Sequence, residues 1–281
     1  MIAVISFLLV VCFSCVCMAD EAATFASVED RTFVAGLDAT QQKYVMMTPQ
    51  GWMTDQPVSL LIAFHGHGSD RWQFVKQDRD ECRATRDVAA THGMLLVSPD
   101  YRATTSWMGP GAEADVLQII RTLKKHIQIE RVILCGGSMG GTAALTFAAL
   151  HPEMVDGVVS LNGTANLVDY ARFEDAIAAS FGGTRQQVPE EYRNRSAEFF
   201  AQCFTMPLAA TTGGRDDVVP ADSVLRLLDR VREHNSKVLS IHHADGGHST
   251  NYADTKRALE FVISASEMPN QQPQNGKLSC P

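Results

Sequence analysis

A short glycine-rich stretch constrains the fold of this sequence more than any other feature. Residues 136–141 read Gly-Gly-Ser-Met-Gly-Gly, directly after the apolar run 131–135 and before residues 142–150, which are rich in Ala and Leu. Gly-x-Ser-x-Gly between a strand and a helix is the nucleophile elbow, a tight turn that lifts the serine hydroxyl clear of the sheet. The pattern predicts that Ser138 is a nucleophile and that the following helix directs its amide groups at a developing oxyanion.

The rest of the chain alternates apolar runs with helical segments. A nearly continuous apolar run is typical of a strand buried on both faces. The alternation therefore predicts an α/β fold, a mostly parallel twisted sheet with helices on both faces. The interval 165–202 is longer than one crossover needs, and it predicts a small lid insertion. The expected strands are residues 58–64, 94–99, 132–135, 154–161, 208–212 and 238–242, after an edge hairpin over 32–49; the expected helices are 72–91, 111–127, 142–150, 224–231 and 254–264.

Length and charge limit the number of domains and the class of partner. With 281 residues, of which 45% are hydrophobic, the chain can bury one large core, and we expect a single domain over residues 20–268. The net charge of −8 argues against a nucleic acid or an anionic membrane as the main partner. Residues 269–281 are rich in Gln, Asn and Pro and predict a disordered tail.

The first nineteen residues have the composition of a targeting segment. Residues 2–17 are almost wholly apolar, and small residues at the −3 and −1 positions precede Asp20. This pattern predicts a signal peptide cleaved after Ala19, and hence a secreted or periplasmic protein that leaves the membrane after cleavage. The alternatives are an uncleaved membrane anchor, since a basic segment is missing, and a lipoprotein, for which Cys12 is the wrong residue three positions before Cys15.

Four of the seven cysteines lie beyond this leader: Cys82, Cys135, Cys203 and Cys280. Export permits disulfides, but four scattered cysteines do not fix a pairing. Cys135 ends an expected strand and is interpreted as a small core residue.

A serine hydroxyl needs a base, and the base needs an acid that holds its tautomer. In a nucleophile-elbow fold the acid follows the serine in the chain and the histidine comes last. The turn at 213–220 carries carboxylates after an expected strand. Asp216 is the predicted acid because Asp-x-x-Val-Pro is the usual spacing in such turns, and Asp217 is the alternative.

The predicted base lies in the loop that follows the last strand. Paired glycines at 246–247 leave that loop free to bring the imidazole of His248 to Ser138. His242 and His243 are alternatives by residue type. They lie on the expected strand itself, where a histidine is more often structural.

An oxyanion hole needs two backbone donors. The amide of Met139, directly after the nucleophile, is the first candidate, and the amide of His67 in the loop 65–68 is the second. Ligands of open α/β folds bind beyond the carboxyl ends of the strands. The residues there that are expected to bind substrate are Trp107, Met108 and Asn162.

At this point the chain resembles the α/β-hydrolase superfamily over residues 58–263, which implies the α/β-hydrolase fold. It is most similar to the branch that holds prolyl-oligopeptidase-type peptidases, feruloyl and acetyl esterases, and polyester depolymerases. Peptidases of that branch usually carry a propeller domain first, and too few residues precede Val58 to form one. The motifs that carry the resemblance are residues 64–68, 99–102, 136–141, 192–196 and 216–220.

The resemblance and the residues together predict hydrolysis of a carboxylic ester through an acyl-enzyme. His248, oriented by Asp216, deprotonates Ser138 and later activates water, so no metal or organic cofactor is required. The expected substrate is a small-molecule or polymer ester, such as acylated polysaccharide or polyester fragments. The alternatives are a peptidase, an acyltransferase, and a ligand-binding protein on a hydrolase scaffold.

Two other chemistries have partial sequence support. A two-zinc site of the metallo-β-lactamase kind would need His-x-His-x-Asp-His after His65, but Ser69 takes the acidic place and Asp70 follows it. A phosphate-binding loop at 136–141 would need a lysine that is absent. Neither alternative is therefore favoured.

Overall fold

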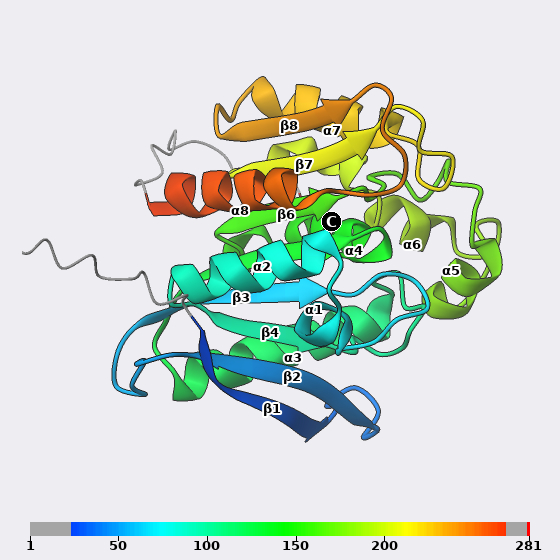
Figure 1. The fold of residues 1–281 in the computed structure, drawn as a ribbon. Helices are drawn as coiled ribbons and strands as arrows, with labels where there is room; N and C mark the ends of the chain where they lie inside the picture. Colours follow the sequence, from blue (N-terminus) through cyan, green and yellow to red (C-terminus); the bar gives the residue numbers. More distant parts are fainter. Residues whose placement is uncertain (1–23, 268–279) are drawn as a thin grey trace, which may run out of the picture.

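The computed structural model describes residues 24–267 and 280–281, and a single eight-stranded sheet forms its centre (Figure 1). The strands are ordered β1-β2-β4-β3-β5-β6-β7-β8. From β4 to β8 neighbouring strands are parallel, while β2 pairs antiparallel with both β1 and β4. The strands are β1 Phe25–Val34, β2 Gln41–Pro49, β3 Val58–Phe64, β4 Leu95–Pro99, β5 Ile129–Gly137, β6 Gly157–Leu161, β7 Leu208–Gly213 and β8 Val238–His243.

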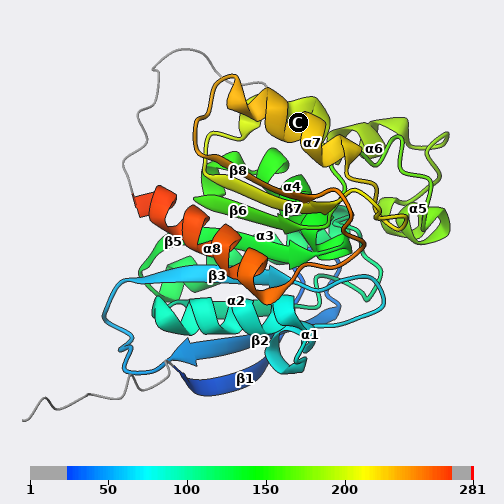
Figure 2. The same cartoon turned by 45° about the horizontal axis from the view of Figure 1, so that its top comes forward.

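Helices cover both faces of the sheet, as Figures 1 and 2 show. Helices α3, α4 and α7 pack on one face in the larger hydrophobic cluster, and α2 and α8 pack on the other face in a second cluster. Every residue of α4 before Leu150 is buried, as expected of a helix enclosed on all sides. The α-helices are α1 Gln73–Lys76, α2 Asp80–Thr91, α3 Pro110–His126, α4 Met139–Leu150, α5 Glu174–Phe181, α6 Pro189–Asn194, α7 Asp222–Arg232 and α8 Tyr252–Glu267.

The predicted alternation of strands and helices is confirmed. The hairpin expected over 32–49 begins earlier, at Phe25, and several other elements extend a few residues beyond their expected bounds. Two further elements differ in kind. The helix expected over 72–91 is two helices, because the chain is extended at Gln77 and Arg79. The guanidinium of Arg86 stabilises this break by donating to the carbonyls of Phe74 and Gln77, both at 2.9 Å. The strand expected over 154–161 begins only at Gly157, because a 3-10 turn, Pro152–Met154, precedes it.

The expected insertion, residues 165–202, contains α5, α6 and most of the 3-10 segment Ala197–Cys203. It lies at the end of the molecule where the parallel strands terminate (Figure 1). The side chains of Leu167, Ile177 and Phe181 are buried in the larger hydrophobic cluster. The insertion is therefore packed as a continuation of the core.

A disulfide joins Cys203, at the end of this segment, to Cys280. The sequence left that pairing open, and the other two cysteines within residues 24–267, Cys82 and Cys135, are buried and free. Burial raises the pKa of both thiols to about 12, which keeps them protonated and unreactive. The predicted signal peptide and most of the predicted tail lie outside the described residues.

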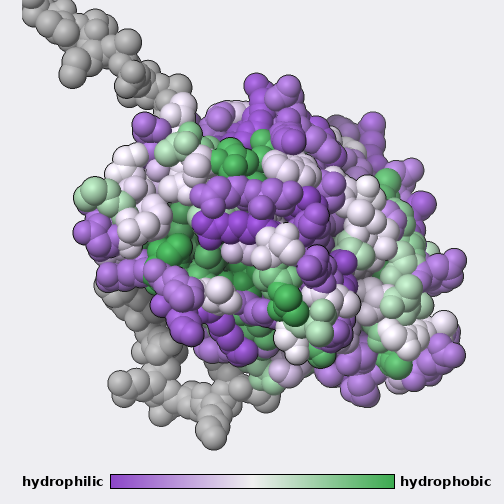
Figure 3. All heavy atoms as spheres, turned by 90° about the horizontal axis from the view of Figure 1, so that it is seen from below, coloured by the Kyte–Doolittle hydropathy of each residue, from purple (hydrophilic) through white to green (hydrophobic). Residues whose placement is uncertain are grey.

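One face of the described part carries hydrophilic and hydrophobic residues side by side. Figure 3 shows this face, on which hydrophobic residues are scattered in small groups among hydrophilic ones. Large hydrophobic side chains that are exposed include Val34, Leu37 and Met53. No helix within residues 24–267 has both the length and the apolar character that a membrane crossing requires.

Candidate active site

Ser138 occupies the turn between β5 and α4, in a conformation that few residues adopt. Its φ of 57° and ψ of −119° are strained for a residue with a side chain. The two flanking glycines make the turn possible. A Cβ at Gly136 would lie 2.3 Å from the carbonyl oxygen of Gly140, and one at Gly140 would lie 2.0 Å from that of Phe64. The backbone, through these glycines, therefore sets the position of Ser138.

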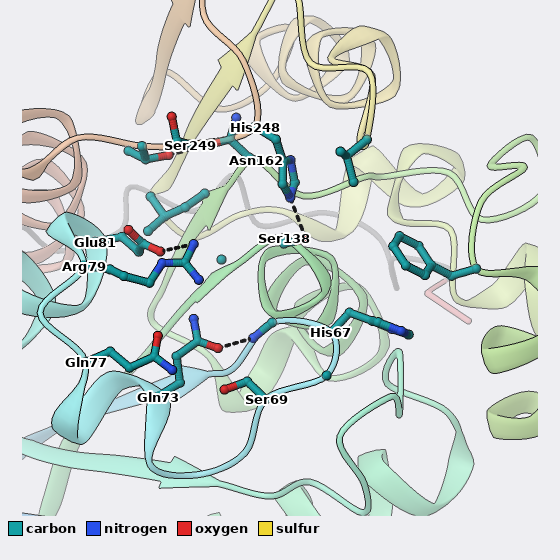
Figure 4. Close-up of a pocket in the computed structure, with 17 residues that line it drawn as sticks. His67, Ser69, Gln73, Gln77, Arg79, Glu81, Ser138, Asn162, His248 and Ser249 are labelled. Atoms are coloured by element: carbon teal, nitrogen blue, oxygen red, sulfur yellow. Dashed lines mark hydrogen bonds and ion pairs between the residues drawn. The ribbon is translucent and has the colours of Figure 1, made fainter.

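Three side chains from distant parts of the sequence meet at this turn. The Ser138 hydroxyl lies 2.9 Å from Nε2 of His248 (Figure 4), and Nδ1 of His248 lies 2.7 Å from Oδ2 of Asp216. With the Asp216 carboxylate accepting from Nδ1–H, Nε2 is free to accept the serine proton. This arrangement can convert the hydroxyl into a nucleophile.

Asp216 is held in place by its own turn. Its Oδ1 accepts hydrogen bonds from the amides of Val218 and Val219, at 3.0 and 2.8 Å, and its side chain is fully buried. Asp217, the alternative acid, is exposed to solvent. The turn therefore directs one carboxylate at the histidine and the other outward.

The alternative histidines on β8 point to other partners. Nδ1 of His242 lies 2.9 Å from the hydroxyl of Thr212, and Nε2 of His243 lies 2.7 Å from Asp254. Only His248, in the loop after β8, reaches Ser138 among the described histidines.

Asn162, predicted to bind substrate, lines the cavity, but its side chain is hydrogen-bonded to neighbouring protein groups. Its amide nitrogen lies 3.5 Å from Oδ2 of Asp216 and 3.5 Å from the carbonyl of Gly247, next to His248. Its Oδ1 accepts hydrogen bonds from the hydroxyls of Thr211 and Thr250. Asn162 therefore connects the ends of β6 and β7 to the loop that carries His248.

The two residues predicted to form the oxyanion hole, Met139 and His67, lie next to the turn at Ser138 or in the loop beside it. Met139 is the first residue of α4, so its amide has no acceptor within the helix. The loop that contains His67 runs beside the turn, since a Cβ at Gly66 would lie 3.8 Å from that of Ser138. The side-chain oxygen of Gln73 accepts a hydrogen bond from the backbone amide of Gly66 at 2.8 Å, and this contact holds the loop in place. The pair of amides can stabilise negative charge on an oxygen bound to Ser138.

The His67 side chain belongs to a stack of aromatic rings. Its ring lies 4.2 Å from that of Phe173, and its Nδ1 accepts a hydrogen bond from the indole of Trp107 at 3.1 Å. Burial lowers the pKa of the imidazole, which favours the neutral form that this hydrogen bond requires. Trp107 and Met108 are fully buried and do not line the cavity, so Trp107 supports its wall from behind.

A cavity of about 530 Å³ opens around Ser138 and His248. Its two sides differ in chemistry. The aromatic wall consists of His67, Phe173 and Val218, and the polar wall consists of Ser69, Gln77, Arg79 and Glu81. Figure 4 shows the residues of the polar wall on the opposite side of Ser138 from the His67 side chain.

Neither wall is predicted in full by the sequence. Phe173 lies in the insertion, where no motif distinguishes it from its neighbours. Gln77 and Arg79 fall inside the helix predicted over 72–91, and they reach the cavity only because the chain is extended between α1 and α2. The acidic residues at 80–81 are the sequence signal for this break, because acidic side chains favour the first turn of a helix.

The histidines of the first loop do not form a metal site with their neighbours. Nε2 of His65 lies 3.2 Å from the carbonyl of Asp100, and burial lowers the pKa of this imidazole. The His67 ring points to Trp107 instead. Within residues 24–267 and 280–281, no group of three or more His, Cys, Asp or Glu side chains is arranged to hold a metal ion.

A sequence model of the prolyl oligopeptidase family matches residues 87–263, more than half of the chain. The chain belongs to the prolyl oligopeptidase family. The matched span contains Ser138, Asp216 and His248, and it places the protein among serine hydrolases. No curated protein matches the sequence itself.

Solved structures of similar fold include both peptidases and other hydrolases. A putative dipeptidyl aminopeptidase IV from Bacteroides ovatus superposes with a TM-score of 0.66 at 17% identity, over 86% of this chain but only 35% of its own. The fluorophosphonate-binding serine hydrolase F of Staphylococcus aureus gives 0.66 at 15% identity, over 86% of this chain and 99% of its own. The CE1 ferulic acid esterase of Anaeromyces mucronatus gives 0.63 at 15% identity, over 88% and 93%. These likenesses establish the α/β-hydrolase fold.

Proposed function

We propose that the protein hydrolyses carboxylic esters, with Ser138 as nucleophile, His248 as general base and acid, and Asp216 as the residue that orients the histidine. The observation that carries this proposal is the unbroken hydrogen-bond chain from Ser138 through His248 to the buried Asp216. The strained turn at Ser138, which the first residue of α4 follows directly and the loop of His67 flanks, supports the same proposal.

The reaction proceeds in two halves. In the first, His248 takes the proton of Ser138 as its Oγ attacks the ester carbonyl carbon, and the imidazolium then protonates the departing alkoxide, leaving an acyl-enzyme. In the second, His248 deprotonates a water that attacks the acyl carbon, and the proton returns to Ser138 as the acid leaves. The amides of Met139 and His67 stabilise both tetrahedral oxyanions, and one such donor is worth roughly 3 kcal/mol.

The cavity is compatible with an ester substrate, because it joins an aromatic wall to a polar wall within about 530 Å³, a volume that can hold a small ester or the end of an acylated polymer. One similar structure that this chain covers over 93% of its length is described as a ferulic acid esterase, and this description supports an ester over a peptide.

Peptide cleavage is the second candidate, and the family match itself favours it, because the family is named for an oligopeptidase. The same three residues would serve, with an amine as the leaving group. An amine leaves less readily than an alcohol, so peptidase activity depends more strongly on protonation by His248.

We further propose that the protein is exported, with residues 1–19 as its signal peptide. The Cys203–Cys280 disulfide supports export, because disulfides persist in oxidising compartments. Expression of the full sequence with fractionation and amino-terminal sequencing tests this: the exported protein should begin at Asp20. Recovery of the intact leader in the membrane fraction would contradict cleavage.

Turnover of a panel of p-nitrophenyl esters, from acetate to long acyl chains, tests the proposed reaction. An aminoacyl anilide serves as the peptidase arm, and EDTA is added to detect any dependence on metal. We expect ester turnover that depends on chain length, ignores EDTA and falls by about 10⁶-fold in Ser138→Ala. Cleavage of the anilide alone would move the assignment to a peptidase, and activity surviving in Ser138→Ala would remove Ser138 from the mechanism.

A further inference from the structure

The polar wall of the cavity has a chemistry that the proposed reaction does not use. Nη2 of Arg79 lies 2.6 Å from Oε1 of Glu81, and the Glu81 side chain is only 9% exposed whereas that of Arg79 is 57% exposed. An arginine has five N–H donors and a carboxylate two acceptor oxygens, so this pair leaves donors and an acceptor unused. The two charges compensate one another, and the wall is close to neutral.

Further polar side chains of the same cavity have no hydrogen-bond partner within the described part of the chain. These are the side chains of Ser69 and Gln77, in the polar wall, and of Ser249, in the loop that carries His248. Two hydroxyls and an amide therefore line the same cavity as Arg79 and Glu81 (Figure 4). The cavity offers both donors and acceptors on this side.

The backbone that carries these groups is held firmly. Gln77 follows α1 and Arg79 precedes α2, both in extended conformation. The guanidinium of Arg86 donates hydrogen bonds to the backbone carbonyls of Phe74 and Gln77, and these hold the break between α1 and α2. Because the break is stabilised from behind, the side chains at its tip are presented to the cavity before any ligand binds.

We propose that the polar wall binds the hydroxyl groups of a sugar or other polyol whose ester is the substrate. Each hydroxyl both donates and accepts, so a polyhydroxylated alcohol can satisfy Arg79, Glu81 and Gln77 together. The acyl group then lies against the aromatic wall on the other side of Ser138. This inference rests on the proposed ester hydrolysis and names the alcohol that the site selects.

A charged substrate fits the wall less well. An ammonium group that approached Glu81 would also meet the guanidinium of Arg79, and a carboxylate that approached Arg79 would meet Glu81. Either ion would have to compete with an existing 2.6 Å pair. Neutral hydroxyls can bind both members without separating them.

Two esters of the same acid test the inference: methyl 6-O-butanoyl-glucopyranoside and cyclohexylmethyl butanoate. Both place a primary ester on a six-membered ring, and only the first has ring hydroxyls. We expect kcat/KM of the wild type to favour the sugar ester. Arg79→Met should lower the ratio of the two kcat/KM values at least about tenfold, the effect of losing one hydrogen bond to a charged group, and Gln77→Leu about threefold.

Arg83→Met is the matched control. Arg83 lies on the same helix as Glu81, pairs with Asp80 at 2.9 Å and does not line the cavity, so its substitution should leave the ratio at the wild-type value. Arg79→Met leaves the buried Glu81 unpaired and could prevent folding. In that case the ratio of the two kcat/KM values in Gln77→Leu tests the inference. Equal hydrolysis of both esters by the wild type, or a preference that survives both substitutions, overturns the inference and leaves ester hydrolysis intact. Hydrolysis of neither ester overturns the inference together with the proposed function.

Discussion

The residues that would carry out the reaction and the residues that would select its substrate are held in different ways. Asp216 is fully buried, and backbone amides fix its carboxylate. Ser138 is positioned by a strained turn that only glycine neighbours allow. On the cavity walls, by contrast, the Arg79 side chain is 57% exposed and Phe173 is 37% exposed.

Substitutions in the two regions should therefore have different effects. Backbone geometry fixes the reacting atoms, so a change there should abolish turnover of every substrate alike. The walls consist of side chains presented at helix ends and in the insertion, so a change there should alter the order of preference among substrates.

The largest effect is expected from the elbow. In Gly140→Ala the new Cβ would lie 2.0 Å from the carbonyl oxygen of Phe64, so the turn cannot form and turnover of all esters should be lost. Overpacking of this kind also costs about 1–3 kcal/mol of unfolding free energy, which thermal denaturation measures. Gly137→Ala is the control, because a Cβ there meets nothing within 4 Å and should leave the melting temperature unchanged. Wild-type turnover by Gly140→Ala would show that the backbone of the elbow does not fix the position of Ser138.

A smaller but still general loss is expected from the acid. Asp216→Asn should lower kcat about 10⁴-fold for all esters, since an amide no longer holds the His248 tautomer that accepts the serine proton. Asp217→Asn, one residue away and exposed, should stay within about twofold of the wild type. Steady-state kinetics on both variants measures this, and similar losses in the two would show that the turn does not discriminate between the carboxylates.

An intermediate effect is expected from Asn162, which lines the cavity and also contacts Asp216 and the loop of His248. Asn162→Ala removes the contacts to Asp216, Gly247 and Thr250, so we expect kcat to fall about tenfold with KM little changed. Asn235→Ala is the matched control: it is also buried and hydrogen-bonded, to Phe204 and Met206, but lies outside the cavity. It should lower stability and leave kcat intact. Equal kinetic effects of the two substitutions would assign Asn162 a purely structural role.

The smallest effect is expected from the aromatic wall, and it should depend on the substrate. Phe173→Ala should lower kcat/KM for aryl-containing acyl groups about threefold to tenfold relative to acetate, the range of one lost aromatic contact. Phe199→Ala tests the specificity of that change, because Phe199 is half-buried in the same insertion but does not line the cavity. A uniform loss across all acyl groups in Phe173→Ala would contradict the separation of walls from reaction centre.

The same division explains what could be predicted from the sequence. The sheet, the elbow at Ser138 and the turn at Asp216 are encoded by neighbouring residues, so apolar runs and glycine or proline positions suffice to find them. The cavity walls depend on contacts between distant residues, such as Arg86 holding the break after α1. The Cys203–Cys280 disulfide spans 77 residues, and spacing alone did not indicate it.

Trp107 shows why the residues that line the cavity could not all be predicted from the sequence. An aromatic residue after a strand at the active edge of the sheet suggests a pocket wall, yet its ring is fully buried behind His67. Whether a loop side chain is exposed depends on which other segment packs over it. Here Phe173, from the insertion, packs against the Trp107 ring. That packing has no local sequence pattern.

The central claim is that Ser138 is the residue acylated during turnover. Incubation of the wild-type protein with a fluorophosphonate, followed by proteolysis and mass spectrometry, tests it most directly. We predict a single phosphonyl adduct on Ser138, loss of ester turnover in proportion to labelling, and no adduct in Ser138→Ala. An adduct on another residue, or full ester turnover by the Ser138→Ala variant, would show that Ser138 is not the nucleophile.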